Sequence, residues 1–145
     1  MNFNIIKSHY KNNEQAIFNA GKNEWGIDPY EWNEFYKLTP IENALWADIR
    51  SVDCVLYPQY PVGKYFVDFG NPVAKVAIEC DGKAFHQNYE KDRKREMDMS
   101  LLGWHIYRIS GSDCKKDFDE ETMESSIPYK FITEIAITHG IKRIP

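Results

Sequence analysis

The chain has 145 residues, of which 43% are hydrophobic and 14% aromatic, and it carries a formal net charge of −4 at pH 7. This composition is typical of one globular domain and excludes a disordered chain. The acidic balance does not indicate a nucleic-acid-binding protein. It does not exclude one either, because clustered metal-binding carboxylates lower the net charge without preventing a local basic surface.

Neither the N-terminus nor the cysteines indicate export. The first residues lack the basic and then apolar order of a signal peptide, and no apolar run approaches the roughly 20 residues of a membrane span. Cys54, Cys80 and Cys114 form no CxxC pair, so neither a zinc site nor a disulfide framework is expected. We therefore expect a cytoplasmic protein with no membrane contact.

The first part of the chain gives little indication of its secondary structure. Residues 1–27 show no sustained period, whereas Asp28, with a proline after it and a glutamate three residues on, is typical of a helix start. A short aromatic helix is expected over residues 29–37. We expect residues 1–38 to form a helical extension packed on a main domain of residues 39–145.

A second helix start follows at once. Thr39 and Glu42 have the spacing of a capping box, with a proline at the first helical position between them. The pattern predicts a helix over residues 40–50 with an apolar stripe that includes Leu45 and Ile49.

Three short runs rich in β-branched and aromatic residues come next. They predict strands over residues 53–57, 64–69 and 73–80, each bounded by glycine, proline or asparagine. The tight link at residues 70–72 predicts that the second and third strands form a hairpin.

The remaining elements alternate between helix and strand. The pattern predicts a helix over residues 88–102, a strand over 104–109, a polar connection over 111–119, and a last helix from Pro128 to about Gly140. A helical crossover of this length allows the fourth strand to lie parallel to its partner. The order of elements predicts an α/β protein with a mixed central sheet flanked by helices.

Three acidic residues lie on or next to apolar strands. Asp68 interrupts the second strand, Glu79 lies near the end of the third, and Asp81 follows on the same face by simple alternation. Taken singly, Asp68 and Asp81 fit turn acids and Glu79 a solvated face. Taken together they favour a site, because ionised carboxylates on buried strands are costly without a cation or donors. The spacing alone does not bring Asp68 to Glu79.

Such a set of oxygens suits Mg²⁺, or Mn²⁺ as a substitute. The expected ligands are Asp68, Glu79 and Asp81, together with the Cys80 carbonyl. Without metal these acids would repel each other, so Glu79→Gln is expected to keep or raise the melting temperature of the metal-free protein.

A wider set of motifs occurs between residues 39 and 112. Its members are Pro40-Ile41-Glu42 with Leu45, Gln59, Val67-Asp68-Phe69, Ile78-Glu79-Cys80-Asp81-Gly82 with Phe85-His86, Asp92 with Arg95, Met99, Gly103-Trp104, Arg108 and Gly111-Ser112. In order and spacing this set resembles the Vsr-like (very-short-patch-repair-related) endonucleases of the PD-(D/E)XK superfamily. The resemblance covers about half of the chain.

The resemblance implies a restriction-endonuclease-like αβββαβ core with metal ligation by Asp68 and Glu79. The superfamily usually has a lysine two residues after the second acid, where this chain has Asp81, as the Vsr-like branch commonly does. Either Asp81 holds a second metal, or Lys83 or His86 supplies the lysine's function. His86 also fits a packed or capping histidine.

Glu42 has two interpretations that remain open. The capping box alone accounts for it, whereas the resemblance implies a helix glutamate that faces the metal.

A stretch rich in basic residues, from Lys83 to Arg95, directly follows Glu79 and Asp81. It suggests DNA phosphate contacts, with a solvated helix face as the alternative. Arg95 shares an inward stripe with Asp92, Met99 and Leu102, so it is either a phosphate-binding residue or an ion-pair partner of Asp92. The proposed nucleic-acid-binding residues are Lys91, Arg93, Lys94, Arg95 and Arg108.

The sequence is therefore compatible with two alternative functions. The first is a Mg²⁺-dependent DNA endonuclease in repair, restriction or mobile-element biology, with Asp68, Glu79, Asp81, Glu42, Lys83 and His86 as its catalytic residues. The second is a catalytically inactive nuclease-fold module that binds DNA or a protein partner. Cleavage of both strands by a chain of this size would require a homodimer.

Overall fold

The computed structural model describes residues 3–29, 38–81, 89–114 and 126–143. Its centre is a four-stranded sheet in the order β1-β2-β3-β4. The first three strands are antiparallel neighbours and β4 is parallel to β3. The antiparallel pairing of the second and third strands was predicted, and a parallel fourth strand was allowed by the helical crossover. The strands are β1 (Tyr57–Val62), β2 (Tyr65–Asn71), β3 (Val76–Asp81) and β4 (His105–Ser110).

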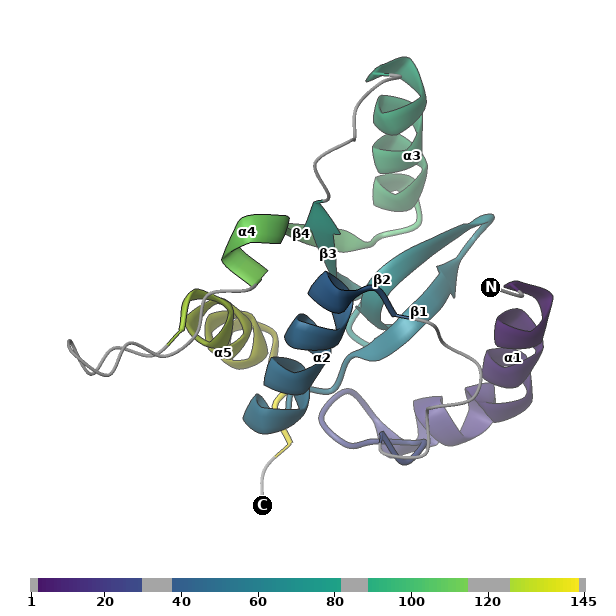
Figure 1. The fold of residues 1–145 in the computed structure, drawn as a ribbon. Coiled ribbons are helices and arrows are strands. Elements are labelled where there is room, and N and C mark those ends of the chain that lie inside the picture. The colour runs from purple at the N-terminus through teal and green to yellow at the C-terminus, as the bar shows by residue number, and fades with distance from the viewer. Residues whose placement is uncertain (1–2, 30–37, 82–88, 115–125, 144–145) are drawn as a thin grey trace.

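Helices cover both faces of this sheet. Figure 1 shows α2 and α5 beside each other, α1 at the opposite side, and α3 projecting away from the body of the molecule. The described helices are α1 (Phe3–Ala20), α2 (Pro40–Val52), α3 (Tyr89–Leu101), α4 (Gly111–Cys114) and α5 (Ile127–His139).

Alternating side chains of the strands divide the core in two. Ile78 of β3 packs with α2, α4 and α5 in one cluster, and Ala77 packs with α1 and Met99 of α3 in the other. This alternation is the expected consequence of the pleat. It leaves Glu79 on the face of Ala77, toward α3, and Cys80 on the face of Ile78.

The predicted helix boundaries of α2, α3 and α5 agree with the structure within about two residues. At the start of α2, the Thr39 hydroxyl accepts from the Glu42 amide at 3.2 Å, and the Glu42 carboxylate accepts from the Thr39 amide at 3.0 Å. This is the predicted capping box. The expected helix over residues 29–37 lies outside the described residues.

A helical extension was expected over residues 1–38, but no bounds were predicted for helix α1 within it. Helix α1 buries only Ile6, Tyr10 and Ile17, while its other positions are largely polar, so the apolar stripe is too narrow to stand out in the sequence. Tyr10 also donates a hydrogen bond to the Pro58 carbonyl of β1. The helix is therefore held by a few tertiary contacts with the sheet, which local pattern does not reveal.

The predicted first strand over residues 53–57 was wrong. The strand is Tyr57–Val62, and it contains Pro58 and Pro61, which the sequence interpretation treated as boundaries. An edge strand tolerates proline where the missing N–H would have pointed to solvent. Because β1 lies at the edge of the sheet, it can contain proline where a central strand could not.

The β2–β3 hairpin turns later than predicted. Residues 72–75 form the turn, Asn71 pairs with Val76, and Lys75 has a positive φ of 56°. The Asn71 side chain holds this turn by accepting from the amides of Val73 and Ala74, both at 3.0 Å. Lys75 is therefore not on the strand, and its Nζ donates to the Leu102 carbonyl at 2.9 Å.

This wider turn shifts the register by several residues. Phe69 pairs with Ile78, so Asp68 and Glu79 are the next residues along their strands. Asp68 is thus brought to the end of β3, beside Glu79.

No helix in the described part of the chain has the length and apolar character that crossing a membrane requires.

Candidate metal centre

The Asp68 carboxylate lies between β2 and β3. Its Oδ2 accepts a hydrogen bond from the Cys80 amide at 2.8 Å. Burial raises the pKa of Asp68 to about 7; the Cys80 amide and Arg95 oppose the rise, and the negative charges of Glu79 and Glu42 add to it. The ionised form of Asp68 thus lacks sufficient compensation from the described residues.

Glu79 is held by a bidentate ion pair. Arg95 of α3 donates from Nη1 to Oε1 at 2.7 Å and from Nη2 to Oε2 at 2.9 Å, and it also donates to the Phe66 carbonyl at 2.9 Å. The guanidinium lies 5.7 Å from the centre of the Tyr65 ring. Arg95 therefore pairs with Glu79 rather than with Asp92, its expected partner one turn away.

A second arginine approaches the same carboxylate. Arg108 of β4 lies 3.9 Å from Oε1 of Glu79 and forms an ion pair with Glu96 of α3. Both Arg108 and Glu96 are partly exposed. Positive charge thus gathers on the α3 side of Glu79, where a phosphate group could be received.

Glu42 combines its capping role with a contact to β1. It is buried, and its Oε2 accepts from Gln59 Nε2 at 3.3 Å. Gln59 is itself buried and has a positive φ of 54°. Gln59 was named in the sequence only as part of the resemblance, without a role. A polar residue between two prolines in an otherwise apolar stretch was a usable signal.

Several expected site residues cannot be placed. Lys83 and His86 lie outside the described residues, as does the side chain of Asp81, whose main chain pairs with Ser110. Among the described side chains, no group of three or more His, Cys, Asp or Glu residues is gathered closely enough to hold a metal ion.

The described residues nevertheless fit a hard cation. Asp68 is a partly buried carboxylate whose charge is disfavoured by desolvation and by two neighbouring acids, and an added cation would oppose both effects. Carboxylate and carbonyl oxygens are the ligands that Mg²⁺ prefers. Glu79, however, already has both oxygens on Arg95, so a cation would have to share that carboxylate.

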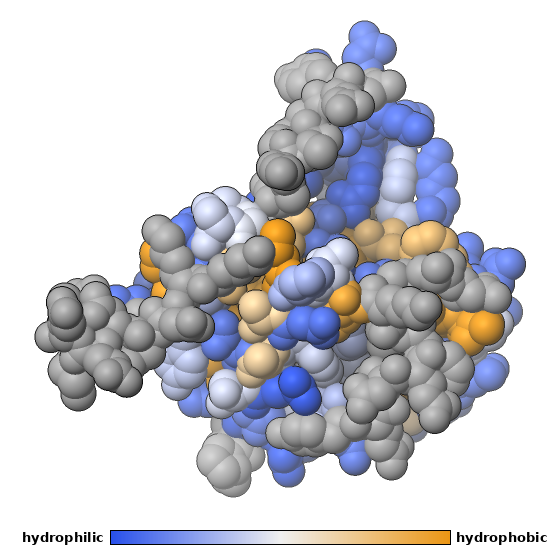
Figure 2. All heavy atoms as spheres, viewed as in Figure 1, coloured by the Kyte–Doolittle hydropathy of each residue, from blue (hydrophilic) through white to orange (hydrophobic). Residues whose placement is uncertain are grey.

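Most of the basic residues proposed to bind DNA lie on α3, the helix that projects from the molecule. Lys91, Arg93 and Lys94 are exposed, and Lys94 pairs with Asp98 at 2.9 Å. Figure 2 shows that the surface of α3 is largely hydrophilic. Leu102, which the sequence placed on the inward stripe, is 47% exposed, whereas Met99 is fully buried as expected.

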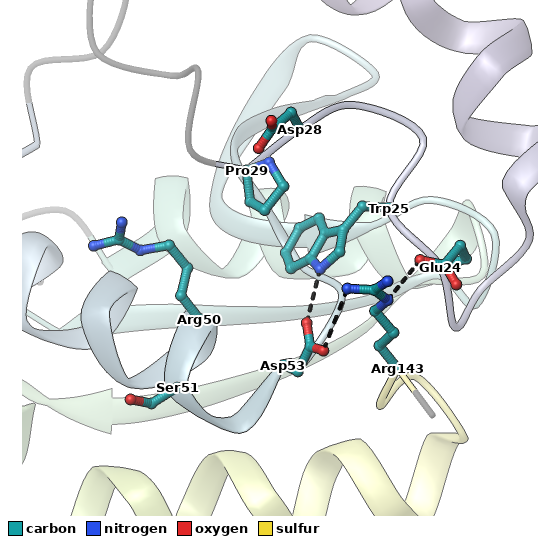
Figure 3. Close-up of a pocket in the computed structure, with 8 residues that line it drawn as sticks. All are labelled: Glu24, Trp25, Asp28, Pro29, Arg50, Ser51, Asp53 and Arg143. Carbon is teal, nitrogen blue, oxygen red and sulfur yellow. Dashed lines mark hydrogen bonds and ion pairs between the residues drawn. The ribbon is translucent and has the colours of Figure 1, made fainter. Parts of the chain in front are cut away.

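A cavity of about 440 Å³ lies elsewhere on the molecule (Figure 3). Arg143 pairs with Glu24 at 2.8 Å, and Trp25 donates to Asp53 at 3.0 Å, so much of its charged lining is internally satisfied. Arg50 lines it from the last turn of α2, whereas Glu42 is in the first turn. Eight helical residues separate these two positions by about 12 Å. The cavity is therefore distinct from the carboxylate centre.

The sheet order and the flanking helices, with Asp68 within β2 and Glu79 near the end of β3, define an α/β protein with a restriction-endonuclease-like fold. The chain belongs to the restriction-endonuclease-like family REase_MTES_1575, which it matches over residues 42–125. That range contains Glu42, Asp68, Glu79 and Asp81, the acidic residues of the candidate metal centre.

Three known proteins are similar to this chain. The uncharacterized protein YcjD of Escherichia coli (strain K12) is 32% identical over 93 residues, which span 62% of this chain and 78% of that protein. An uncharacterized protein of Haemophilus influenzae (strain ATCC 51907 / DSM 11121 / KW20 / Rd) is 28% identical over 107 residues, 64% of this chain and 87% of that protein. Among solved structures, the catalytic domain of the homing endonuclease I-Bth0305I matches 70% of this chain and 98% of its own, with a TM-score of 0.54 and 21% identity. The last likeness concerns the fold.

Proposed function

We propose that this protein is a Mg²⁺-dependent endodeoxyribonuclease of the cytoplasm that resembles the Vsr-like endonucleases of the PD-(D/E)XK superfamily. The family and the fold of the homing endonuclease domain support a nuclease. The observation that carries the proposal is the partly buried Asp68 carboxylate, whose charge is unfavourable without a cation, directly beside the strand end that bears Glu79.

Each residue has a distinct role in this proposal. Asp68, Glu79 and the Cys80 carbonyl would hold the ion, with Asp81 as a further ligand. When bound, such an ion lowers the pKa of a water and stabilises charge on the phosphate being cut. Arg108 would bind a phosphate oxygen once its ion pair with Glu96 opens, because both groups are exposed to solvent.

Two further roles concern Glu79 and the proton of the water. Arg95 would keep the Glu79 carboxylate in a fixed orientation through its two parallel hydrogen bonds. His86 would accept the proton of the attacking water, with Lys83 as the alternative source of charge.

Cleavage of supercoiled plasmid DNA tests the proposal. The wild type is expected to cut with Mg²⁺ or Mn²⁺, and Asp68→Asn and Glu79→Gln are expected to abolish cutting. Strong loss in Asp81→Ala would favour a second ion at Asp81, and strong loss in His86→Ala or Lys83→Ala would favour the loop residues.

The control for this assay is Glu134→Gln, an exposed carboxylate of α5 that is expected to cut normally. A nicked product would fit a monomer, and direct linearisation would support the proposed homodimer. Inactivity of the wild type with every divalent cation would refute the nuclease proposal.

One observation favours the alternative, a nuclease-fold module that binds DNA or a protein without cutting. Arg95 donates a hydrogen bond to each oxygen of Glu79, and in an active metal centre this carboxylate must also bind a cation. A chain whose arginine permanently neutralises the acid would keep the fold and lose the chemistry. DNA binding without cleavage, together with no measurable Mn²⁺ affinity, would establish this alternative.

The basic face of α3 gives a prediction about DNA affinity. Replacing Lys91 and Lys94 with alanine is expected to weaken binding to every DNA sequence and to reduce the salt dependence by about one unit of slope per lost phosphate contact. Fluorescence anisotropy at several salt concentrations measures both effects. Lys7→Ala with Lys11→Ala, an exposed pair on α1, is the matched control. Equal effects of both double variants would show that α3 has no special role.

A further inference from the structure

Two thiols face each other beside the carboxylate centre. The Sγ atoms of Cys80, on β3, and Cys114, the last residue of α4, lie 3.5 Å apart. The chain reaches this arrangement because β4 pairs with β3 up to Asp81–Ser110, after which α4 turns back over the end of β3. The two cysteines are separated by 34 positions in the sequence, so their approach is purely tertiary.

This arrangement requires little movement to form a covalent bond. A disulfide has an S–S distance of about 2.05 Å, so the two sulfur atoms need to approach by about 1.5 Å. Both cysteines belong to or pack against the same buried cluster, together with Ile109 and Leu45. Cys114 is buried and Cys80 is partly exposed, so the pair lies at the edge of the core rather than at its centre.

The third cysteine provides an internal contrast. Cys54 is fully buried, and burial followed by the charge of Asp53 raises its pKa far above the ordinary value. It lies just after the C-terminal end of α2, where its main chain forms an isolated β-bridge with Lys142. Cys54 is therefore protected from oxidation and is not positioned to compete for either of the other two thiols.

We propose that Cys80 and Cys114 form a redox-active dithiol that closes to an intramolecular disulfide in the presence of a peroxide. The two thiols lose two protons and two electrons as the S–S bond forms, and one hydrogen peroxide molecule takes them up as its O–O bond breaks to give two waters. A thiol reductant such as dithiothreitol reverses the reaction by thiol–disulfide exchange.

The position of the dithiol gives the disulfide a consequence for the carboxylate centre. Cys80 lies between Glu79 and Asp81, and its amide donates to Asp68. Drawing Cys80 toward α4 shifts the amide that orients Asp68 and the carbonyl that would face the cation. Loss of such an orienting contact typically costs about ten- to a hundredfold in metal affinity. This consequence rests on the proposed function, whereas formation of the disulfide does not.

Mass spectrometry of the native, full-length protein tests the disulfide. The reduced protein is treated with stoichiometric hydrogen peroxide, free thiols are alkylated, and the intact mass and peptide map are recorded. The expected product has lost two hydrogen atoms, links Cys80 to Cys114 and keeps Cys54 alkylatable after unfolding. Cys54→Ala should form the same link, and Cys114→Ala should not.

Two results would overturn the proposal of a dithiol. One is oxidation of Cys80 to its sulfinic acid while Cys114 remains free, and the other is formation of the link only in unfolded protein. Melting temperatures of both alanine variants show that they are folded under the conditions of the assay.

Isothermal titration with Mn²⁺ tests the effect on the carboxylate centre. The oxidised protein is expected to bind Mn²⁺ about ten- to a hundredfold more weakly than the reduced protein, and dithiothreitol should restore the affinity. Peroxide-treated Cys114→Ala should retain the affinity of the reduced wild type. Equal affinity in both redox states would overturn the link to the centre. Absence of Mn²⁺ binding by the reduced protein would instead refute the proposed function and leave the disulfide result standing.

Discussion

Replacing Asp68 with asparagine is expected to stabilise the metal-free protein at pH 8 and to leave it nearly unchanged at acid pH. Burial raises the pKa of this carboxyl from 3.8 to about 7. The folded state therefore binds the proton more tightly than the unfolded state, and the stability from this group is present below about pH 4 and lost as the pH rises to 7. Asparagine resembles the protonated form and does not titrate.

The size of the effect follows from the same pKa. One pKa unit corresponds to about 1.4 kcal/mol, so the free energy of unfolding at pH 8 should rise by roughly 2 to 4 kcal/mol. Chemical denaturation in EDTA at several pH values measures it. The exposed control Glu134→Gln should show no such difference.

With a divalent cation present, the wild type should become more stable to unfolding than Asp68→Asn. Mg²⁺ at a hundred times its dissociation constant stabilises a protein by about 2.7 kcal/mol, and this is expected for the wild type but not for Asp68→Asn. Destabilisation by Asp68→Asn in EDTA at pH 8 would show that Cys80 and Arg95 already satisfy the ionised carboxylate.

Replacing Arg95 with alanine is expected to destabilise the protein by about 2 to 3 kcal/mol. The change leaves Glu79, whose side chain is only 12% exposed, without its partner, and frees the Phe66 carbonyl. Removing one member of a buried ion pair costs about 3 to 5 kcal/mol, and the partial exposure of Arg95 reduces this. Lys94→Ala, at the next position of α3, should have little effect because its ion pair is exposed.

A double-mutant cycle assigns the loss to the ion pair. Glu79→Gln should also lower the free energy of unfolding, and the double variant should lose less than the sum of the two single losses. This reverses the expectation from sequence that Glu79→Gln keeps or raises the melting temperature, because that expectation treated Glu79 as an unpaired acid. Strict additivity would show that Arg95 contributes through packing on Tyr65 instead.

The elements with strong local signals were predictable. The capping box at Thr39, the proline start of α5 and the glycine end of α3 each depend on interactions within a few residues, so the sequence contains the whole cause. The apolar strands with acidic interruptions also pointed to Asp68 and Glu79, because burying a charge requires a reason wherever the chain folds.

The errors have a common physical origin. Strand β1 contains two prolines that only an edge position makes acceptable, and α1 is stabilised by a few contacts with the sheet. The late turn after Asn71 depends on side-chain hydrogen bonds that set the register. Each feature is decided by a neighbour that the local sequence does not specify.

By itself, then, the sequence determined the fold class, most helices and the acids that carry the proposed chemistry, since these follow from local hydrogen bonding and the cost of buried charge. The tertiary structure alone decided which groups meet. It paired Arg95 with Glu79 rather than Asp92, brought Asp68 to the Cys80 amide, and placed Cys114 against Cys80. These contacts join segments from 12 to 34 positions apart, and sheet register and helix packing select them from many that the sequence would allow.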